Sequence, residues 1–405
     1  MRNWQWFVII ATLSALWFGL VKESPSKLEI FLVASVLLWL VILEVAEKGR
    51  LNVDRYAILL VIKTERGRDF IYSLGKHRSF WRAVGYPVAF AGIAGTLFMV
   101  GMFAIALYFM FSSSVDLLQP TPLVPGYTIP FWYGIIGLIS VLVVHELAHG
   151  VFAAANRVSV KSLGIALIGA LPIGAFVEPD EEELKRSPWL DQLKVFSSGS
   201  VANLLLAFLV SLAMPFYIAG VFDTSEGGVL IVSIVKGSPA EDVLEKGMVI
   251  KKIQDEAIQT MEDFYRVVKK LKPGERISIV TDRGSFSLVT AQREDDPERG
   301  FIGVKTTFFF PVKEGVKEYL GVTLPMVIFY SLYWIALLNQ AIGFVNLAPL
   351  HLGVAATDGH HILRLIFEKF LATRDAERLS AYISTAMVLI IIFSIFKPSF
   401  LMAGG

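Results

Sequence analysis

The sequence has 405 residues, of which 55% are hydrophobic and only 18% are charged. Because soluble proteins carry roughly 25% charged residues, this composition indicates a membrane protein that sits in the lipid bilayer. The net charge of +1 gives no reason to expect a nucleic-acid partner. The sequence contains no cysteine, which excludes disulfides and cysteine nucleophiles.

The first part of the chain predicts a membrane anchor followed by a cytoplasmic segment. Two apolar runs, 4–20 and 28–45, predict a transmembrane helical hairpin over 1–46. The segment 47–83 is rich in Lys and Arg, so we expect it on the cytoplasmic side. Within it, the runs 56–63 and 69–72 flank a turn-like Glu-Arg-Gly-Arg and predict a small β-hairpin.

The stretch 129–155 carries the strongest functional signal. It is long and apolar enough to cross a bilayer, and Glu146 is its only formally charged residue. On a helix, His145 and His149 lie one turn apart on the same face, where two imidazoles can bind one zinc ion. Glu146 can then take a proton from a water that the zinc activates. The alternative is a pair of packed histidines beside a buried, protonated glutamate, although such residues are rare in a span unless they have a function.

Further spans are expected at 84–111, 193–219, 322–347 and 381–396, which gives about seven crossings in all. Residues 158–178 are apolar but interrupted by glycine and proline, so they make a poor spanning helix. We expect them to form a re-entrant β-hairpin beside the motif, because irregular backbone at membrane depth must be buried or line a wet cavity.

Residues 223–293 have the composition of a small soluble domain. Strands are expected at 228–234, 246–251, 276–280 and 285–290, with a helix at 261–271, which together indicate an α+β domain. The distribution of Lys and Arg places this domain outside the cytoplasm. The flanking segments, 84–222 and 294–405, would form the membrane core.

With these segments in place, the sequence resembles the site-2 proteases, a family of intramembrane zinc metalloproteases. The first matching element is His145-Glu146-Leu147-Ala148-His149 in a span. The other two are Gly199-Ser-Val-Ala-Asn203 in the next span and Asn346-x-x-Pro349 followed by Asp358-Gly359 in a later one. Residues 224–292 resemble a PDZ domain, and 172–179 resembles the membrane-associated hairpin of the family.

The resemblance implies a catalytic Zn²⁺ with Glu146 as general base and three protein ligands, His145, His149 and Asp358. Residues 350–357 make the connection before Asp358 longer than is usual in the family. This departure leaves three competing candidates for the third ligand, His351, His360 and His361. A further alternative is that Asp358 only caps the helix that follows it.

Several residues are candidates for substrate binding. Asn203 and Asn346 could hydrogen-bond an unwound substrate or its oxyanion, although asparagine in a span can equally join helices. Gly174 lies in the hairpin that could pair with a substrate as an added strand. On the PDZ-like domain, the resemblance points to a peptide-binding edge formed by Gly228, Val229 and Leu230.

The expected function is hydrolysis of a peptide bond within the span of a single-span membrane protein, carried out by a multi-pass protein of the cell membrane. An upstream protease that cuts the substrate first is one potential partner. Two other functions stay open: a membrane scaffold without catalysis that acts through its PDZ-like domain, and a metal- or proton-linked transporter.

Overall fold

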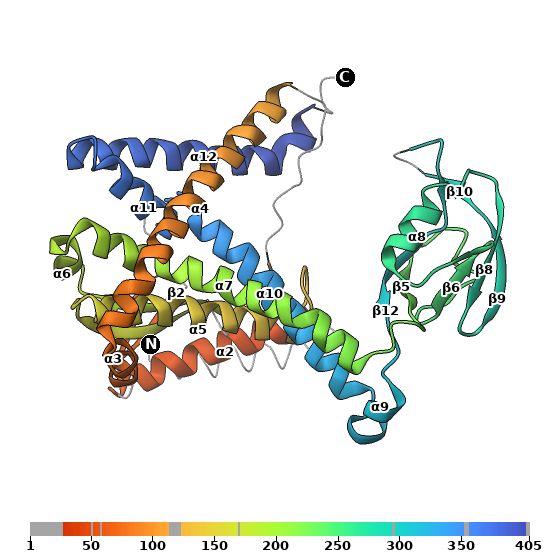
Figure 1. Cartoon of the computed structure of the whole chain (residues 1–405), viewed down its shortest axis with the longest axis horizontal. Helices are drawn as coiled ribbons and strands as arrows, with labels where there is room; N and C mark the ends of the chain where they lie inside the picture. Colours follow the sequence, from red (N-terminus) through yellow and green to blue (C-terminus); the bar gives the residue numbers. More distant parts are fainter. Residues whose placement is uncertain are drawn as a thin grey trace, which may run out of the picture. The chain divides into compact units, whose positions relative to one another are not determined.

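The computed structural model describes residues 27–49, 52–56, 59–112, 123–168, 171–293, 296–351 and 356–401 (Figure 1). The first predicted span, 4–20, lies outside these residues. The chain divides into two units. One consists of Met1–Val210 with Trp334–Gly405, and the other of Ser211–Tyr333.

Four helices of the described chain are long and apolar enough to cross a membrane: α4 (Arg78–Ser112), α5 (Phe131–Ala155), α7 (Trp189–Val221) and α10 (Thr323–Leu347). They match four of the predicted spans, because apolar runs of this length strongly favour a helix. Helices α2 (Lys27–Glu47) and α12 (Thr373–Leu401) occupy two further predicted positions. That these two cross the membrane stays a prediction.

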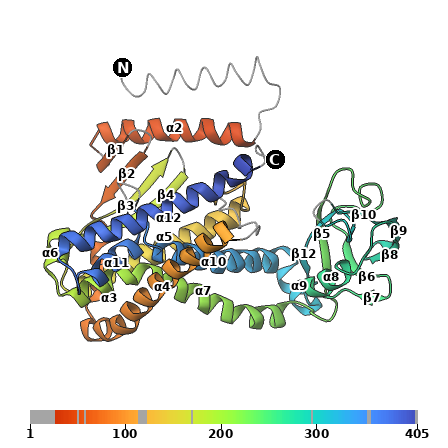
Figure 2. The same cartoon turned by 90° about the horizontal axis from the view of Figure 1, so that it is seen from above.

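A four-stranded antiparallel sheet belongs to the first unit. Its order is β1 (Asn52–Tyr56), β2 (Leu59–Thr64), β3 (Val160–Ile168) and β4 (Leu171–Pro179) (Figure 2). Strands β3 and β4 form the hairpin expected at 158–178. Helix α2 packs against the sheet through Ile42 and Leu43, which contact Leu60. Re-entry of this hairpin into the membrane stays a prediction.

The predicted hairpin at 56–63 and 69–72 is wrong in its second strand. Residues 69–72 belong to helix α3 (Arg68–Gly75), and β2 pairs instead with β1 and β3. The helix follows Gly67, whose φ of 97° turns the chain. Ile71 and Gly75, four residues apart, are both buried, and a Cβ on Gly75 would lie 2.8 Å from Ala154 Cβ on α5. Burial at helical spacing therefore decides the local structure.

Two short helices complete the first unit. Helix α6 (Glu181–Arg186) is capped by Asp180, whose carboxylate accepts hydrogen bonds from the N–H groups of Glu182 and Glu183. The acidic side chains at 180–183 thus stabilise the N-terminus of this helix. Helix α11 (Asp358–Phe367) packs against α12 and α4.

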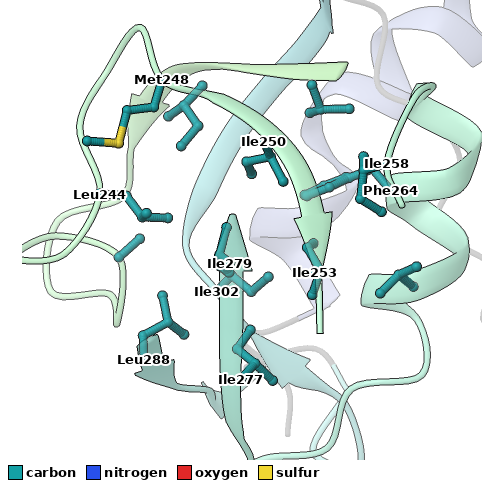
Figure 3. Close-up of a cluster of buried hydrophobic side chains, with 14 of the residues drawn as sticks. Leu244, Met248, Ile250, Ile253, Ile258, Phe264, Ile277, Ile279, Leu288 and Ile302 are labelled. Atoms are coloured by element: carbon teal, nitrogen blue, oxygen red, sulfur yellow. The ribbon is translucent and has the colours of Figure 1, made fainter. Parts of the chain in front are cut away.

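The second unit contains the small α+β domain. Its main sheet has the order β12 (Val304–Phe309), β5 (Gly228–Ile234), β6 (Val249–Ile253), β8 (Arg276–Thr281) and β9 (Gly284–Val289), with β7 (Glu256–Ala257) beside β6. The remaining elements are α8 (Met261–Val268), the strand pair β10 (Ala291–Gln292) and β11 (Gly300–Phe301), and α9 (Glu314–Leu320). The core between sheet and helix includes Ile250, Ile279 and Phe264 (Figure 3).

The strands predicted near 228, 246, 276 and 285 and the helix near 261 are present. However, the sheet does not end with the predicted domain at residue 293. Strand β12 pairs with β5 over its whole length, from Val304 opposite Ile234 to Phe309 opposite Gly228. The pairing strand lies about 70 residues further along the chain, and sequence spacing cannot reveal such a non-local partner.

Candidate metal centre

Helix α5 and the first residue of α11 bring three ligand-type side chains together. The Nε2 atoms of His145 and His149 lie 3.1 Å apart. Asp358 places Oδ1 3.2 Å from Nε2 of His149 and Oδ2 3.6 Å from Nε2 of His145. All three side chains are buried. Among the described residues they form a group that could hold a metal ion.

The spacing of these atoms fits a zinc ion. Zinc–nitrogen and zinc–oxygen bonds of about 2.0–2.2 Å in tetrahedral geometry separate neighbouring ligand atoms by roughly 3.3–3.5 Å. The three separations, 3.1, 3.2 and 3.6 Å, bracket this value. Two imidazoles and one carboxylate also match the ligand types of catalytic zinc sites, which keep a fourth position open.

The hydrogen bond at the other side of the His149 ring fixes its tautomer. Nδ1 lies 2.7 Å from the carbonyl oxygen of Val195 on α7. A carbonyl can only accept, so Nδ1 carries the proton and the lone pair of Nε2 faces the ligand group. The hydroxyl of Ser198 donates to the same carbonyl at 2.7 Å.

Asn203 holds the His145 ring in a similar way. Its Nδ2 is placed 3.2 Å from Nδ1 of His145, while its buried Oδ1 has no hydrogen-bond partner among the described residues. Amide oxygen and nitrogen are interchangeable by rotation about the side chain. With the amide turned over, Oδ1 accepts the Nδ1 proton, and Nε2 of His145 offers its lone pair to a metal. Asn203 of α7 thus contacts the His145 ring of α5, as the helix-joining alternative predicts.

Gly199 keeps the space between the two imidazoles open. A Cβ at this position would lie 2.4 Å from Nε2 of His149 and 2.8 Å from Nε2 of His145. No heavier residue fits without displacing a ring. The glycine therefore lets α7 approach both histidine rings closely, which leaves their Nε2 atoms in place to bind an ion.

Two described residues at the ends of the connection before Asp358, Leu350 and Thr357, are hydrogen-bonded to each other. The N–H of Leu350 donates to Oγ1 of Thr357 at 3.0 Å, and the N–H of Thr357 donates to the carbonyl of Leu350 at 3.0 Å. The chain therefore returns directly to the start of α11. Gly359 allows close packing there, because a Cβ would lie only 2.0 Å from the carbonyl oxygen of Leu347. Ser200 donates to Oδ2 of Asp358 at 2.6 Å and orients the carboxylate.

The three competing histidines lie elsewhere in the same cavity. His360 contacts Ser384 through Nδ1 at 2.9 Å, and His351 stacks on the His360 ring with centroids 4.9 Å apart. His361 stacks on Phe196 at 4.5 Å. None of them joins the group formed by His145, His149 and Asp358 within the described chain.

The cavity has a volume of about 740 Å³ and is lined by Glu146, by Asn346 and by the three clustered side chains. Oε2 of Glu146 accepts a hydrogen bond of 2.7 Å from the backbone N–H of Val177 on β4. Gly174 lies three residues earlier on the same strand. The sequence pattern did not single out Ser200 or Val177. For Ser200, the sequence offers one indication: a run of Ser and Gly at 197–200 within an apolar span.

The expected peptide-binding edge at Gly228, Val229 and Leu230 is wrong. Strand β5 is paired on both sides: Val229 lies opposite Phe308 of β12 and Ile250 of β6, and Leu230 is paired in the same way. Its backbone groups are therefore already used. Among the strands that the structure describes, β12 has the free edge on this side of the sheet.

A groove lies at the start of β12. It has a volume of about 620 Å³ and is lined by α8, by the segment 300–304 and by two basic residues, Lys236 and Arg293. Phe264, Tyr265 and Val268 form its apolar wall on α8. The groove thus combines apolar surface with positive charge.

Comparison with known proteins supports the same chemistry. The model of peptidase family M50 matches residues 133–394. An uncharacterised protein of Methanocaldococcus jannaschii is 26% identical over 337 residues, which cover 82% of this chain and 84% of that protein. A protein of Nostoc is 29% identical over 42% of this chain and 56% of its own length, and one of Clostridium perfringens is 24% identical over 53% and 70%. The names of the last two propose a zinc metalloprotease. The chain belongs to peptidase family M50, the site-2 protease family.

Proposed function

We propose that the protein is a zinc metalloendopeptidase that hydrolyses a peptide bond within a membrane-spanning segment of another membrane protein. The observation that carries this proposal is the convergence of His145, His149 and Asp358 beside Glu146 at a cavity bordered by apolar helices. Membership of family M50 supports a membrane zinc protease.

The chain's residues have distinct roles in this reaction. His145, His149 and Asp358 would hold Zn²⁺, and a bound zinc ion supplies a Lewis acid that polarises a carbonyl and acidifies water. Glu146 takes the proton of the attacking water as its oxygen bonds to the carbonyl carbon. It then delivers that proton to the amide nitrogen as the carbon–nitrogen bond breaks. No serine or cysteine nucleophile is required.

A helical substrate must unwind before it can be cut, because its backbone N–H and C=O groups are hydrogen-bonded to one another within the helix. Strand β4, whose Val177 and Pro179 line the cavity, offers an unwound segment a sheet edge. Asn346, which lines the cavity, would donate from its amide to the substrate carbonyl oxygen. Gly174, which lies opposite Ala166 of β3, would leave room for substrate side chains on the face of the same strand.

The proposal extends to location and partners. A single-span protein of the cell membrane, shortened beforehand by another protease, would be the substrate. The basic segment 47–83 would face the cytoplasm, and the small domain would lie outside it. We propose the groove at β12 as the site for the new C-terminus of such a substrate, because Lys236 and Arg293 complement a carboxylate and the free strand edge suits an extended peptide.

A scaffold without catalysis would use only the β12 groove, and a transporter would need only ion binding. Neither explains why Glu146 lies beside the ligand group with its carboxylate directed by Val177. These observations favour the protease.

The test is to incubate purified protein with a single-span substrate in lipid vesicles and to identify the products by mass spectrometry. Wild-type protein should cut inside the span, and Glu146→Gln should not cut. Cleavage only in the substrate's soluble loops would contradict the intramembrane assignment, and equal cleavage by both proteins would contradict the role of Glu146.

A further inference from the structure

Strand β4 is an edge strand of the sheet at the active-site cavity. It pairs with β3, and no other strand of the described chain lies against its second edge. Val177 and Pro179 of β4 line the cavity. One row of backbone N–H and C=O groups therefore faces this space.

The hydrogen bond to Glu146 reveals which backbone groups form that row. In an antiparallel pair, successive residues direct their N–H and C=O groups alternately toward the partner strand and away from it. The N–H of Val177 points to Oε2 of Glu146 at 2.7 Å, so it points away from β3. Ala175 is two residues earlier in the same uninterrupted register, with Ala175 opposite Ile165 and Val177 opposite Leu163. Ala175 therefore also presents its N–H and C=O to the free edge.

The position of Val177 relative to Glu146 is set by close packing. Gly150 lies one helical turn after Glu146 on α5, and a Cβ there would lie 3.2 Å from Cγ1 of Val177. The side chain of Val177 is buried, with 8% exposure, among residues of α3, α5 and α7 that include Ile71 and Phe152. Because Gly150 lets the strand approach the helix, the N–H of Val177 reaches the carboxylate.

We propose that the backbone N–H of Val177 is a positioning group that orients Glu146 and ends the strand pairing between enzyme and substrate. This inference rests on the proposed protease function. An extended substrate pairs with the N–H and C=O of Ala175, while the N–H of Val177 stays with Glu146. The first substrate peptide bond beyond the ladder then lies at the catalytic carboxylate. Since a strand rises about 3.3 Å per residue, that bond is roughly 7 Å beyond the contact with Ala175.

Cross-linking tests the register directly, because the chain has no native cysteine. Ala175→Cys is combined with Glu146→Gln to keep the substrate intact, and single cysteines are placed at successive positions of a single-span substrate. Disulfide formation should peak about two residues from the bond that the wild type cuts and should alternate along the substrate. The matched control is Asn52→Cys on β1, the opposite edge of the sheet, which should not cross-link. Equal yields at both edges, or a peak elsewhere in the substrate, would overturn the proposal.

Two proline variants separate positioning from binding. Proline removes an N–H and is tolerated where that group faces a free edge, and Pro179 already lies in this strand. Val177→Pro should lower kcat about tenfold or more with little change in KM. Ala175→Pro should raise KM with little change in kcat. Bound zinc should stay at the wild-type level in both, which shows that the site is intact.

The outcomes distinguish the two proposals. If the wild type itself cuts nothing, the proposed function fails. If the wild type cuts and Val177→Pro raises KM while kcat is retained, the protease stands and the positioning role of Val177 is wrong. If Val177→Pro loses zinc, its site is no longer intact and its kinetics are not informative. The position of the cross-linking peak then tests the proposed register by itself.

Discussion

The hydroxyl of Ser200 donates a hydrogen bond of 2.6 Å to Oδ2 of Asp358 and so joins α7 to the carboxylate at the start of α11. Groups that hold a ligand in this way contribute to metal affinity without touching the metal. Both side chains are buried, so water is a poor replacement for the lost hydroxyl.

Ser200→Ala should therefore weaken zinc binding about 10- to 100-fold, because the freed carboxylate can rotate away from the histidines. The measurement is zinc retained against a chelator series. Ser197→Ala is the matched control: this neighbouring buried hydroxyl has no hydrogen-bond partner in the described part of the chain. Equal zinc loss in both variants would show that the bond to Asp358 has no special role.

Gly199→Ala should abolish zinc binding while the protein still inserts and folds. The added methyl group would lie 2.4 Å from Nε2 of His149, so one imidazole must leave its place. Gly220→Ala, on the same helix, meets nothing within 4 Å and serves as control. Zinc content by elemental analysis and folding by circular dichroism check the pair. If Gly199→Ala still bound about one zinc per chain, the inference that Gly199 keeps space for both imidazoles would be wrong.

The identity of the third ligand is tested by single substitutions in the cavity. Asp358→Ala should lose zinc, since two histidines alone leave the ion poorly held. His351→Ala and His361→Ala should keep about one zinc per chain, because these rings stack on other side chains away from the ligand group. Loss of zinc in either histidine variant, with retention in Asp358→Ala, would reverse the assignment.

The groove at β12 should bind a short apolar peptide through its free C-terminal carboxylate. We expect amidation of the peptide, or Tyr265→Ala on the full chain, to weaken binding about tenfold, roughly 1.4 kcal/mol. Tyr319→Ala, which removes another exposed tyrosine outside the groove, should have no effect. Fluorescence anisotropy of a labelled peptide measures all three. Equal affinity for the free-acid and the amidated peptide would contradict the proposal that this groove binds a C-terminal carboxylate.

The parts of the fold that sequence predicted are those decided by local composition. Helix α5 and its two histidines follow from a long apolar run and from a spacing of four residues. The strands β5 and β8 follow from short β-branched runs between turns. For these elements the neighbouring residues alone select the structure.

The parts that sequence missed depend on partners far along the chain. Residues 69–72 have a strand-like composition but become helical, because Ile71 is buried one turn from Gly75 against α5. Strand β12 occupies the β5 edge that was expected to be free, and only the folded sheet shows this pairing. Likewise, the sequence leaves open whether Asn203 contacts substrate or joins helices, and only the fold shows that its amide lies next to Nδ1 of His145 on α5.

The most direct test of the central claim is to count bound zinc and measure cleavage in the same preparations of wild type and Glu146→Gln. In the proposed function, His145, His149 and Asp358 hold the zinc, and Glu146 has a separate role in moving the proton. We therefore predict about one zinc per chain in both proteins and cleavage of a single-span substrate only by the wild type. No zinc in either protein, or undiminished cleavage by Glu146→Gln, would contradict the account.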